Sequence, residues 1–285
     1  MKNIIAVLPK EWQESVEKTV NDNITDVRIC YSSPVVFYSP SGEICPEKEG
    51  AFLIPDIRQI SGIIRTASEN SVYSYMDDIR EGFITLKGGH RLGLCGKAVY
   101  DGESLSNIRN VNGINIRVAR EMAGISSEVI PRISSGQKIL STIIVSPPGC
   151  GKTTLLRDIA RTLGNRKNFR PALIDSRYEL AAEHQGKPGL DVGKRTMIMS
   201  GYRKSDGFSH AIRNLSPDVI LCDEIDKSDI PALNYSATCG VSLVVTAHGS
   251  SLQEIRKKMD LSLFGRIVLL SGKTKSAQIF NTEGE

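Results

Sequence analysis

Nine consecutive residues, 146–154, have the composition of a phosphate-binding loop. They read Ser-Pro-Pro-Gly-Cys-Gly-Lys-Thr-Thr, after an apolar run at 142–145 and before a helix-like run at 155–160. A strand, a tight loop and a helix in this order point backbone N–H groups at phosphate oxygens, and the helix N-terminus adds partial positive charge. We therefore expect ATP to be bound by Ser146, Pro147, Pro148, Gly149, Cys150, Gly151, Lys152, Thr153 and Thr154.

Within this loop, two side chains have predicted roles. Lys152 can reach the β- and γ-phosphates, and the Thr153 hydroxyl can ligate Mg²⁺. One position departs from the consensus G-x-x-x-x-G-K-[ST], because Ser146 stands where the first glycine is expected. Serine is small, so we expect the loop to form. The alternative is an ordinary strand-to-helix turn, which a second motif downstream makes the weaker interpretation.

Two carboxylates, Asp223 and Glu224, end the apolar run 219–222, about 70 residues after the loop. The carboxyl ends of strands in an open α/β sheet gather at the ligand site. Asp223 is therefore predicted to hold Mg²⁺ and Glu224 to activate the attacking water. Glu179, which follows an apolar run at 171–175, is a rival catalytic base. A solvated Asp-Glu turn is the structural alternative.

Four further side chains could sense phosphate or act as an arginine finger. Two follow predicted strands, one lies in the basic segment 183–204, and one lies on a predicted helix at 208–215. They are His248, Arg177, Arg195 and Arg213. For His248 a purely structural role is an equal alternative. A basic loop could equally be a solvated face or contact an acidic partner.

The order of elements predicts the fold around these residues. Apolar strands at 142–145, 171–175, 218–222, 241–246 and 266–270 alternate with helical segments, which favours a doubly wound, mostly parallel sheet. We therefore predict a RecA-like α/β P-loop NTPase domain over 138–285.

The first part of the chain has a different pattern. Helical spacing at 11–22 and around 57–67, strands at 24–31, 35–39 and 107–118, and a hairpin of 82–87 with 91–100 predict a small α+β domain over 1–122. The Gly-, Ser- and Pro-rich stretch within 121–137 predicts a linker at 123–137.

Composition excludes several classes of protein. The 285 residues are 40% hydrophobic and 24% charged, and no apolar run approaches the ~18 residues of a membrane span. Six scattered cysteines without a Cys-x-x-Cys pair favour reduced thiols in a cytosolic protein. The net charge of +4 is too small to indicate nucleic acid by itself.

Seven segments in the two halves of the chain carry motifs that together are more specific than any one of them. They are 73–85, 88–93, 115–121, 147–158, 191–196, 211–224 and 246–249. These motifs resemble the stage III sporulation protein AA family of endospore-forming bacteria, and they are more distantly similar to the ATPases of type II and type IV secretion and pilus systems.

This resemblance implies a cytoplasmic ATPase of the mother cell that uses ATP and Mg²⁺. It implies a homo-oligomer, a hexameric ring, held at the membrane through a membrane protein of a sporulation channel complex, with ATP turnover driving transport or assembly. By the match to secretion ATPases, residues 175–179 form the acidic box and His248 the histidine box. Ser176 stands where the sporulation family tends to be acidic, and Asp223 where many secretion ATPases have glycine.

Two other functions stay open at this point. One is an ATP-dependent switch or scaffold with little turnover. The other is a single-strand nucleic-acid-dependent ATPase, suggested by basic residues of the N-terminal half. Aromatic residues make up only 6% of the chain, so stacking platforms are scarce. A solvated sheet face or a subunit contact is the favoured interpretation of these residues, which are Arg80, Lys87, Arg91, Lys97, Arg109, Arg117 and Arg120.

Overall fold

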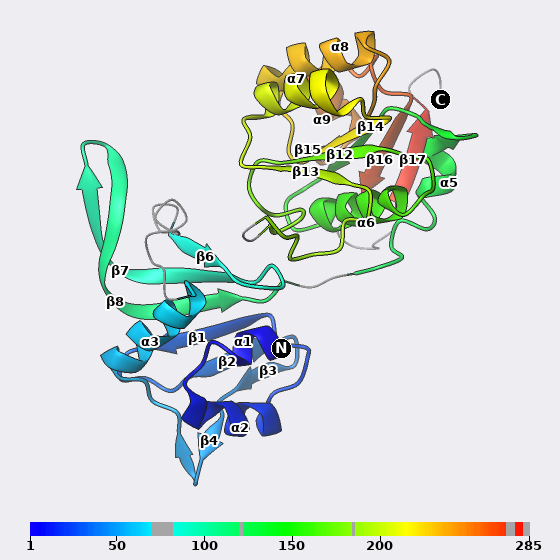
Figure 1. Cartoon of the computed structure of the whole chain (residues 1–285). Coiled ribbons are helices and arrows are strands. Elements are labelled where there is room, and N and C mark those ends of the chain that lie inside the picture. Colours follow the sequence, from blue (N-terminus) through cyan, green and yellow to red (C-terminus); the bar gives the residue numbers. More distant parts are fainter. Residues whose placement is uncertain (70–81, 120–121, 184–185, 272–276, 282–285) are drawn as a thin grey trace. The chain divides into compact units, whose positions relative to one another are not determined.

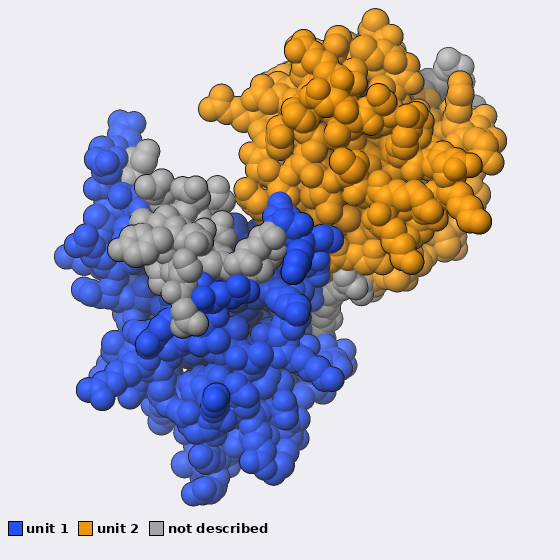
Figure 2. Space-filling model, viewed as in Figure 1, with its two compact units in different colours: residues 1–120, 182–189 blue, residues 121–181, 190–285 orange. Residues whose placement is uncertain are grey.

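The chain folds as two compact units. In the computed structural model, which describes residues 1–69, 82–119, 122–183, 186–271 and 277–281, unit 1 comprises residues 1–120 and 182–189, and unit 2 comprises 121–181 and 190–285 (Figure 2). Arg80, Arg120 and residues 73–81 of the family motifs lie outside the described residues.

Unit 1 is built on an antiparallel sheet of order β3-β2-β1-β8-β7-β6 (Figure 1). Its strands alternate buried and solvent-facing residues, so one face packs under the helices. The elements are α1 (Lys2–Ile5), α2 (Lys10–Thr19), β1 (Asp26–Cys30), β2 (Val36–Ser39), β3 (Gly42–Ile44), β4 (Glu47–Lys48), β5 (Ala51–Phe52), α3 (Ile57–Ala67), β6 (Phe83–Thr85), β7 (Arg91–Asp101) and β8 (Ser104–Arg117).

The long hairpin of β7 and β8 dominates this sheet. Asp101 pairs with Ser104 across a tight turn in which Gly102 has a left-handed φ of 60°. The predicted hairpin of 82–87 with 91–100 is confirmed as the pairing of β6 with β7. The predicted strand 107–118 corresponds to most of β8, which begins three residues earlier, ends at Arg117 and also pairs with β1.

Unit 2 holds a seven-stranded sheet of order β13-β12-β14-β15-β11-β16-β17. Every described pairing is parallel except that of β16 with β17, so the predicted mostly parallel α/β sheet is confirmed. The elements are α5 (Ile130–Ile133), β9 (Ser134–Ser135), β10 (Lys138–Ile139), β11 (Thr142–Ser146), α6 (Lys152–Gly164), β12 (Pro171–Asp175), β13 (Met197–Ser200), α7 (Lys204–Leu215), β14 (Val219–Cys222), η2 (Lys227–Asp229), α8 (Ile230–Thr238), β15 (Ser242–His248), α9 (Leu252–Lys258), β16 (Arg266–Leu270) and β17 (Ala277–Asn281).

Helices cover both faces of this sheet (Figure 1). On one face, α6 packs on a core that includes Ile144, while on the other α7, α8 and α9 pack on a core that includes Ile143. Consecutive strand residues thus enter different cores, which explains why the strands read as continuous apolar runs. The carboxyl ends of β12, β14, β15 and β11 meet at one edge because the strands are parallel.

Several boundaries differ from the sequence-based expectations. The helix expected to 22 ends at Thr19, and the strand expected to end at 246 continues to His248. The edge strands β13 and β17 were not predicted, because both are partly exposed and neither has the continuous buried apolar run of the central strands.

The stretch 123–137 is packed into unit 2 where a linker was expected. Val129, Ile130 and Ile133 are buried in the core beneath α6, and Gly124 and Ser126 are hydrogen-bonded to that helix. The glycines and serines here serve turns and anchoring contacts, which composition alone does not distinguish from a free linker. Residues 182–189 group with unit 1, which the sequence did not indicate either. Over the described residues, no helix has the length and apolarity needed to cross a bilayer.

Candidate active site

The segment between β11 and α6 forms an open loop of the kind that cradles phosphate. β11 is buried throughout and ends at Ser146, and α6 begins at Lys152. Between them Gly149 and Gly151 have φ values of 76° and 88°, in the left-handed region that favours glycine. The loop forms although its first position is Ser146, whose hydroxyl bonds the carbonyl of Pro147 at 2.8 Å.

Lys152 turns back into this loop. Its ammonium donates to the carbonyl oxygens of Ser146 at 3.0 Å and Pro147 at 3.2 Å, and to Nδ1 of His248 at 3.1 Å. The residue is only 5% exposed, and this burial lowers the pKa of Lys152, against the opposing attraction of Asp223 and Glu224. A buried cation held by neutral carbonyls is well placed to exchange them for phosphate oxygens.

Asp223 directly follows β14 and faces the loop. Its Oδ2 accepts a hydrogen bond from the hydroxyl of Thr153 at 2.9 Å, and its Oδ1 accepts one from the hydroxyl of Thr246. The two predicted metal ligands are therefore side by side. Hard oxygen donors of this kind suit Mg²⁺, which takes one or two protein ligands beside substrate phosphates and water. The donor set thus fits the predicted ion.

Glu224 follows with an unusual backbone. Its φ is 50°, in the left-handed region, although it is not glycine. One carboxylate oxygen contacts His248 Nε2 at 3.1 Å, and the other accepts a hydrogen bond from Arg177. Because the ammonium of Lys152 can only donate, Nδ1 of His248 accepts and Nε2 carries the proton donated to Glu224. A continuous chain of contacts therefore joins Lys152, His248, Glu224 and Arg177.

The acidic segment after β12 plays two different parts. Asp175 is buried and accepts hydrogen bonds from the backbone N–H groups of Glu179, Leu180 and Ala181 at 2.8, 3.1 and 2.8 Å. Burial raises the pKa of Asp175, and these backbone hydrogen bonds oppose the rise. Asp175 therefore stabilises the conformation of the loop that follows β12. Glu179 is half-buried, and Arg157 of α6 binds its carbonyl at 2.7 Å.

Arg195 and Arg213 are exposed and are not brought to the loop of their own chain. The backbone N–H of Arg195 donates to the carbonyl of Gly164, which is the last residue of α6. The phosphate loop lies at the other end of this 13-residue helix, about 20 Å away along its axis. Arg213 lies in the last turn of α7, about 13 Å along the helix from Lys204. Of the four candidates, only His248 and Arg177 contact the site.

An apolar pocket of about 370 Å³ adjoins the phosphate loop. Gly149, Cys150 and Gly151 form one side of it. Its other walls are mainly aliphatic side chains, contributed by Met122, Ile125, Val129, Leu155, Leu270 and Ala277. Pockets of this size and lining accept flat, apolar ligand groups such as a nucleobase.

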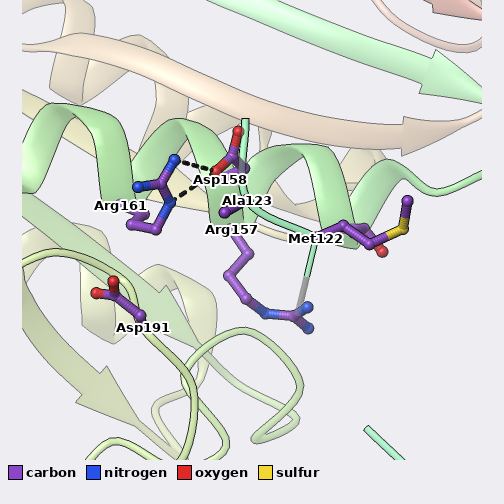
Figure 3. Close-up of a pocket in the computed structure, with 7 residues that line it drawn as sticks. Met122, Ala123, Arg157, Asp158, Arg161 and Asp191 are labelled. Atoms are coloured by element: carbon purple, nitrogen blue, oxygen red, sulfur yellow. Dashed lines mark hydrogen bonds and ion pairs between the residues drawn. The ribbon is translucent and has the colours of Figure 1, made fainter. Parts of the chain in front are cut away.

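A smaller cavity of about 90 Å³ lies farther along α6 (Figure 3). There Asp158, which is 2% exposed, accepts hydrogen bonds from the N–H groups of Gly124 at 3.1 Å and Ser126 at 2.8 Å and pairs with Arg161 at 2.7 Å. These partners hold the pKa of Asp158 below its usual value although burial alone would raise it. Figure 3 shows Arg157 extending away from this pair. Asp158 thus fastens the segment that walls the apolar pocket.

Sequence reasoning missed three residues that shape the site. Thr246 bonds both Asp223 and the N–H of Glu224, the latter at 2.8 Å. Lys204 donates to the carbonyl of Glu224, and Arg157 holds the loop after β12. Thr246 lies two residues before His248 and could have been found from strand periodicity. Nothing local indicates the other two.

Comparison with known proteins identifies a family whose model spans nearly the whole chain. A family model described as "Sporulation stage III, protein AA" matches residues 2–284. Stage III sporulation protein AA of Bacillus subtilis (strain 168) is 31% identical over 299 residues, covering 100% of this chain and 92% of the relative.

Solved structures share the fold. The ATPase DotB of Legionella pneumophila aligns with a TM-score of 0.57 at 14% identity, covering 87% of this chain and 72% of that one. The ATPase DotB of Yersinia pseudotuberculosis aligns with a TM-score of 0.54 at 14% identity, covering 86% and 70%. At this identity the likeness concerns architecture alone.

Proposed function

Because the chain belongs to the stage III sporulation protein AA family, we propose that it is the Mg²⁺-dependent ATPase of a trans-envelope sporulation complex, a motor related in fold to secretion ATPases. The observation that carries this proposal is the joint placement of Lys152 in a glycine loop and of Asp223 beside Thr153. A structural turn would need neither contact.

Different residues of the site bind the triphosphate, the Mg²⁺ ion and the adenine base of ATP. Pro147 and Pro148 carry no backbone N–H, so the N–H groups of residues 149–154 surround the triphosphate, and the ammonium of Lys152 leaves its carbonyl partners for the β- and γ-phosphates. Thr153 and Asp223 would hold Mg²⁺, which supplies neutralisation of charge on the phosphate oxygens when bound. The adenine base enters the apolar pocket, where contacts with Met122 and Ile125 are non-polar.

Hydrolysis then needs a water placed in line with the γ-phosphate. The oxygen of that water bonds to the γ-phosphorus, the bond from that phosphorus to the bridging oxygen breaks, and ADP leaves with the bond's electrons. Glu224 takes the proton of the water. His248 and Arg177 orient its carboxylate, and Glu179 is the rival base.

The assembly we propose is a homo-oligomeric ring, a hexamer, in the mother-cell cytoplasm, held at the membrane by a membrane protein of the sporulation channel. The exposed positions of Arg195 and Arg213 support this proposal. Each lies away from its own loop, so either could serve as an arginine finger only for a neighbouring subunit.

A second function, an ATP-dependent switch with little turnover, is favoured by one observation. Both carboxylate oxygens of Glu224 are engaged, by His248 and by Arg177. A base that stays paired in this way binds water poorly, so ATP could drive assembly without rapid hydrolysis.

Phosphate release measured over a protein concentration series, with particle mass, separates these functions. The variants are Lys152→Ala, Glu224→Gln and Glu179→Gln. For a ring motor, specific activity climbs with protein concentration and mass, and falls about 100-fold or more in Glu224→Gln. Assembly that follows ATP binding, with equal slow rates for wild type and Glu224→Gln, would instead select the switch.

A further inference from the structure

Glu224 adopts a backbone conformation that the chain must enforce. Its φ of 50° brings Cβ toward a carbonyl oxygen and is unfavourable for residues other than glycine. Such strain persists only where surrounding contacts over-determine it, and it gathers at functional sites. The contacts on the two peptide groups of Glu224 therefore show what holds its carboxylate in place.

Three hydrogen bonds from residues distant in the chain hold these peptide groups. The N–H of Glu224 donates to Thr246 Oγ1 at 2.8 Å, and the following N–H of Ile225 donates to the Thr246 carbonyl at 2.8 Å. The third comes from the ammonium of Lys204, which donates to the Glu224 carbonyl. Two of the three come from the neighbouring strand, and Lys204 alone comes from a helix.

Lys204 is itself held firmly. Its side chain is 17% exposed, and its ammonium also contacts Asp229 Oδ2 at 3.3 Å, where Asp229 is 10% exposed. The same carboxylate oxygen accepts the N–H of Asp226 at 2.9 Å. Lys204 thus ties the Glu224 carbonyl to the buried carboxylate of Asp229, which lies in the turn that follows Glu224.

Helix α7, which begins at Lys204, packs closely against the sheet. Phe208 and Ala211 of α7 are fully buried, and a Cβ on Gly207 would lie 3.0 Å from the side chain of Ile174. This close approach fixes α7, and therefore the origin of the Lys204 side chain, relative to β12 and β14.

We infer that Lys204 is a positioning residue that keeps Glu224 in its left-handed conformation and so aims the carboxylate at the attacking water. The inference rests on the proposed function in assigning the base to Glu224. Lys204 donates to the backbone carbonyl of Glu224, so its effect on the attacking water passes through the conformation of Glu224. The sequence alone would place this lysine in a basic segment that contacts a neighbour or solvent.

The test compares Lys204→Met, which removes the ammonium, with Lys204→Arg, which retains a cationic donor. Lys194→Met, an exposed lysine of the same segment, is the matched control. Single-turnover hydrolysis should fall about 10- to 100-fold in Lys204→Met, as for a misplaced catalytic group, and recover at least partly in Lys204→Arg. The dissociation constant for Mg-ATP should stay within about twofold, because the ammonium lies off the phosphate loop.

A double variant distinguishes positioning from a general structural role. In the Glu224→Gln background, Lys204→Met should lower the rate no further, since its effect passes through the residue already replaced. A full additional loss in the double variant, or equal losses in Lys204→Met and Lys194→Met, would overturn the inference.

Crystal structures of wild type and Lys204→Met test the positioning of Glu224 independently of ATPase activity. The inference expects Glu224 to leave the left-handed region and its carboxylate to part from His248. An unchanged Glu224 would overturn the inference even if wild type hydrolyses ATP. If the wild type hydrolyses no ATP but Glu224 is displaced in the Lys204→Met structure, the proposed function is overturned. The positioning contact between Lys204 and Glu224 is then still established.

Discussion

Unit 1 and unit 2 treat buried charge in opposite ways. Among the described residues, the buried ionisable side chains of the Lys and Asp type are Lys152, Asp158, Asp175 and Asp229, and all of them lie in unit 2. The buried polar residues of unit 1 are Ser68, Thr85 and His90. Burying charge is unfavourable unless each group finds partners. Unit 2 thus buries several charged side chains and holds each with partners, whereas the described part of unit 1 buries only neutral or weakly basic polar side chains.

The largest effect should come from the phosphate loop. Gly151→Val forces a β-branched residue into a φ of 88°, although its Cβ would meet no atom within 4 Å. The loop should then reorient its N–H groups. We expect affinity for a fluorescent ATP analogue to fall about 100-fold or more, as for two lost charge-assisted hydrogen bonds of about 1.5 kcal/mol each.

The matched control lies in unit 1. Gly102→Val meets the same backbone restriction at a φ of 60° in an open hairpin turn, also with no atom within 4 Å. It should destabilise unit 1 by about 1–2 kcal/mol and leave ATP affinity unchanged. Equal losses of affinity in the two variants would remove the assignment of the site to unit 2.

The next effect concerns Asp158, which fastens residues 124–126 to α6. Asp158→Ala leaves two backbone N–H groups and Arg161 without their acceptor. We expect about 3 kcal/mol of destabilisation, measured by chemical unfolding. Asp101→Ala in the exposed turn of unit 1 is the control and should change stability by less than about 0.5 kcal/mol. A neutral result for Asp158→Ala would mean that this segment is not anchored.

The stability of unit 1 should fall in acid because His90 becomes protonated. This ring is 7% exposed, and its Nδ1 accepts the N–H of Ala119 at 3.0 Å. Burial, with the N-terminal ammonium as a smaller cause, lowers the pKa of His90 from 6.5 to about 4. The folded form therefore holds a neutral ring, and its stabilising effect is complete above pH 6.5 and is lost as the pH falls toward 4.

Unfolding followed between pH 7 and pH 4 should show this loss. We expect protonation of His90 to contribute about 2 kcal/mol to this loss. A His90→Gln variant should lose that part of the pH dependence. If the wild type and the variant have identical pH profiles, the ring does not titrate as described.

The smallest effect should come from the basic residues of unit 1. Arg91 and Arg117 are directly opposed across β7 and β8, and Arg91 lies 4.6 Å from the ring centre of Phe83. This contact occupies an aromatic ring that could otherwise stack on a base. We expect Arg91→Ala and Arg117→Ala to change ATP hydrolysis less than about twofold, as for solvated surface charges.

Fluorescence polarisation with single-stranded DNA checks the same residues. We expect no binding that weakens as salt rises. Salt-dependent binding by wild type that both variants lose would restore the nucleic-acid-dependent ATPase as a function and make unit 1 the recognition surface.

How far the sequence predicts this molecule depends on whether a feature is local. The phosphate loop, Asp223 and Glu224 follow from contiguous residues, and alternating apolar runs identified the parallel sheet. The contacts of Glu224 could not be foreseen. Arg177 and Lys204 lie 47 and 20 residues away in the chain. Their approach depends on strand order and on helix packing.

Composition also led to a wrong expectation for one segment. Residues 123–137 look like a linker because glycine and serine serve both free chain and anchored turns. Their anchor, Asp158, is a charged residue that a helical pattern would assign to the solvent face of α6. Strand β13 was missed for a related reason, because a short strand at the sheet edge has a weak periodic signal.

Titration calorimetry of the full chain with Mg-ATP tests the central claim most directly, beside Lys152→Ala and with ATP in the absence of Mg²⁺. The account predicts saturable binding at one site per chain, weakened when Mg²⁺ is withheld and lost in Lys152→Ala. Folded wild-type protein that releases no heat and binds no ATP, or that binds it equally well with Lys152 removed, would contradict it.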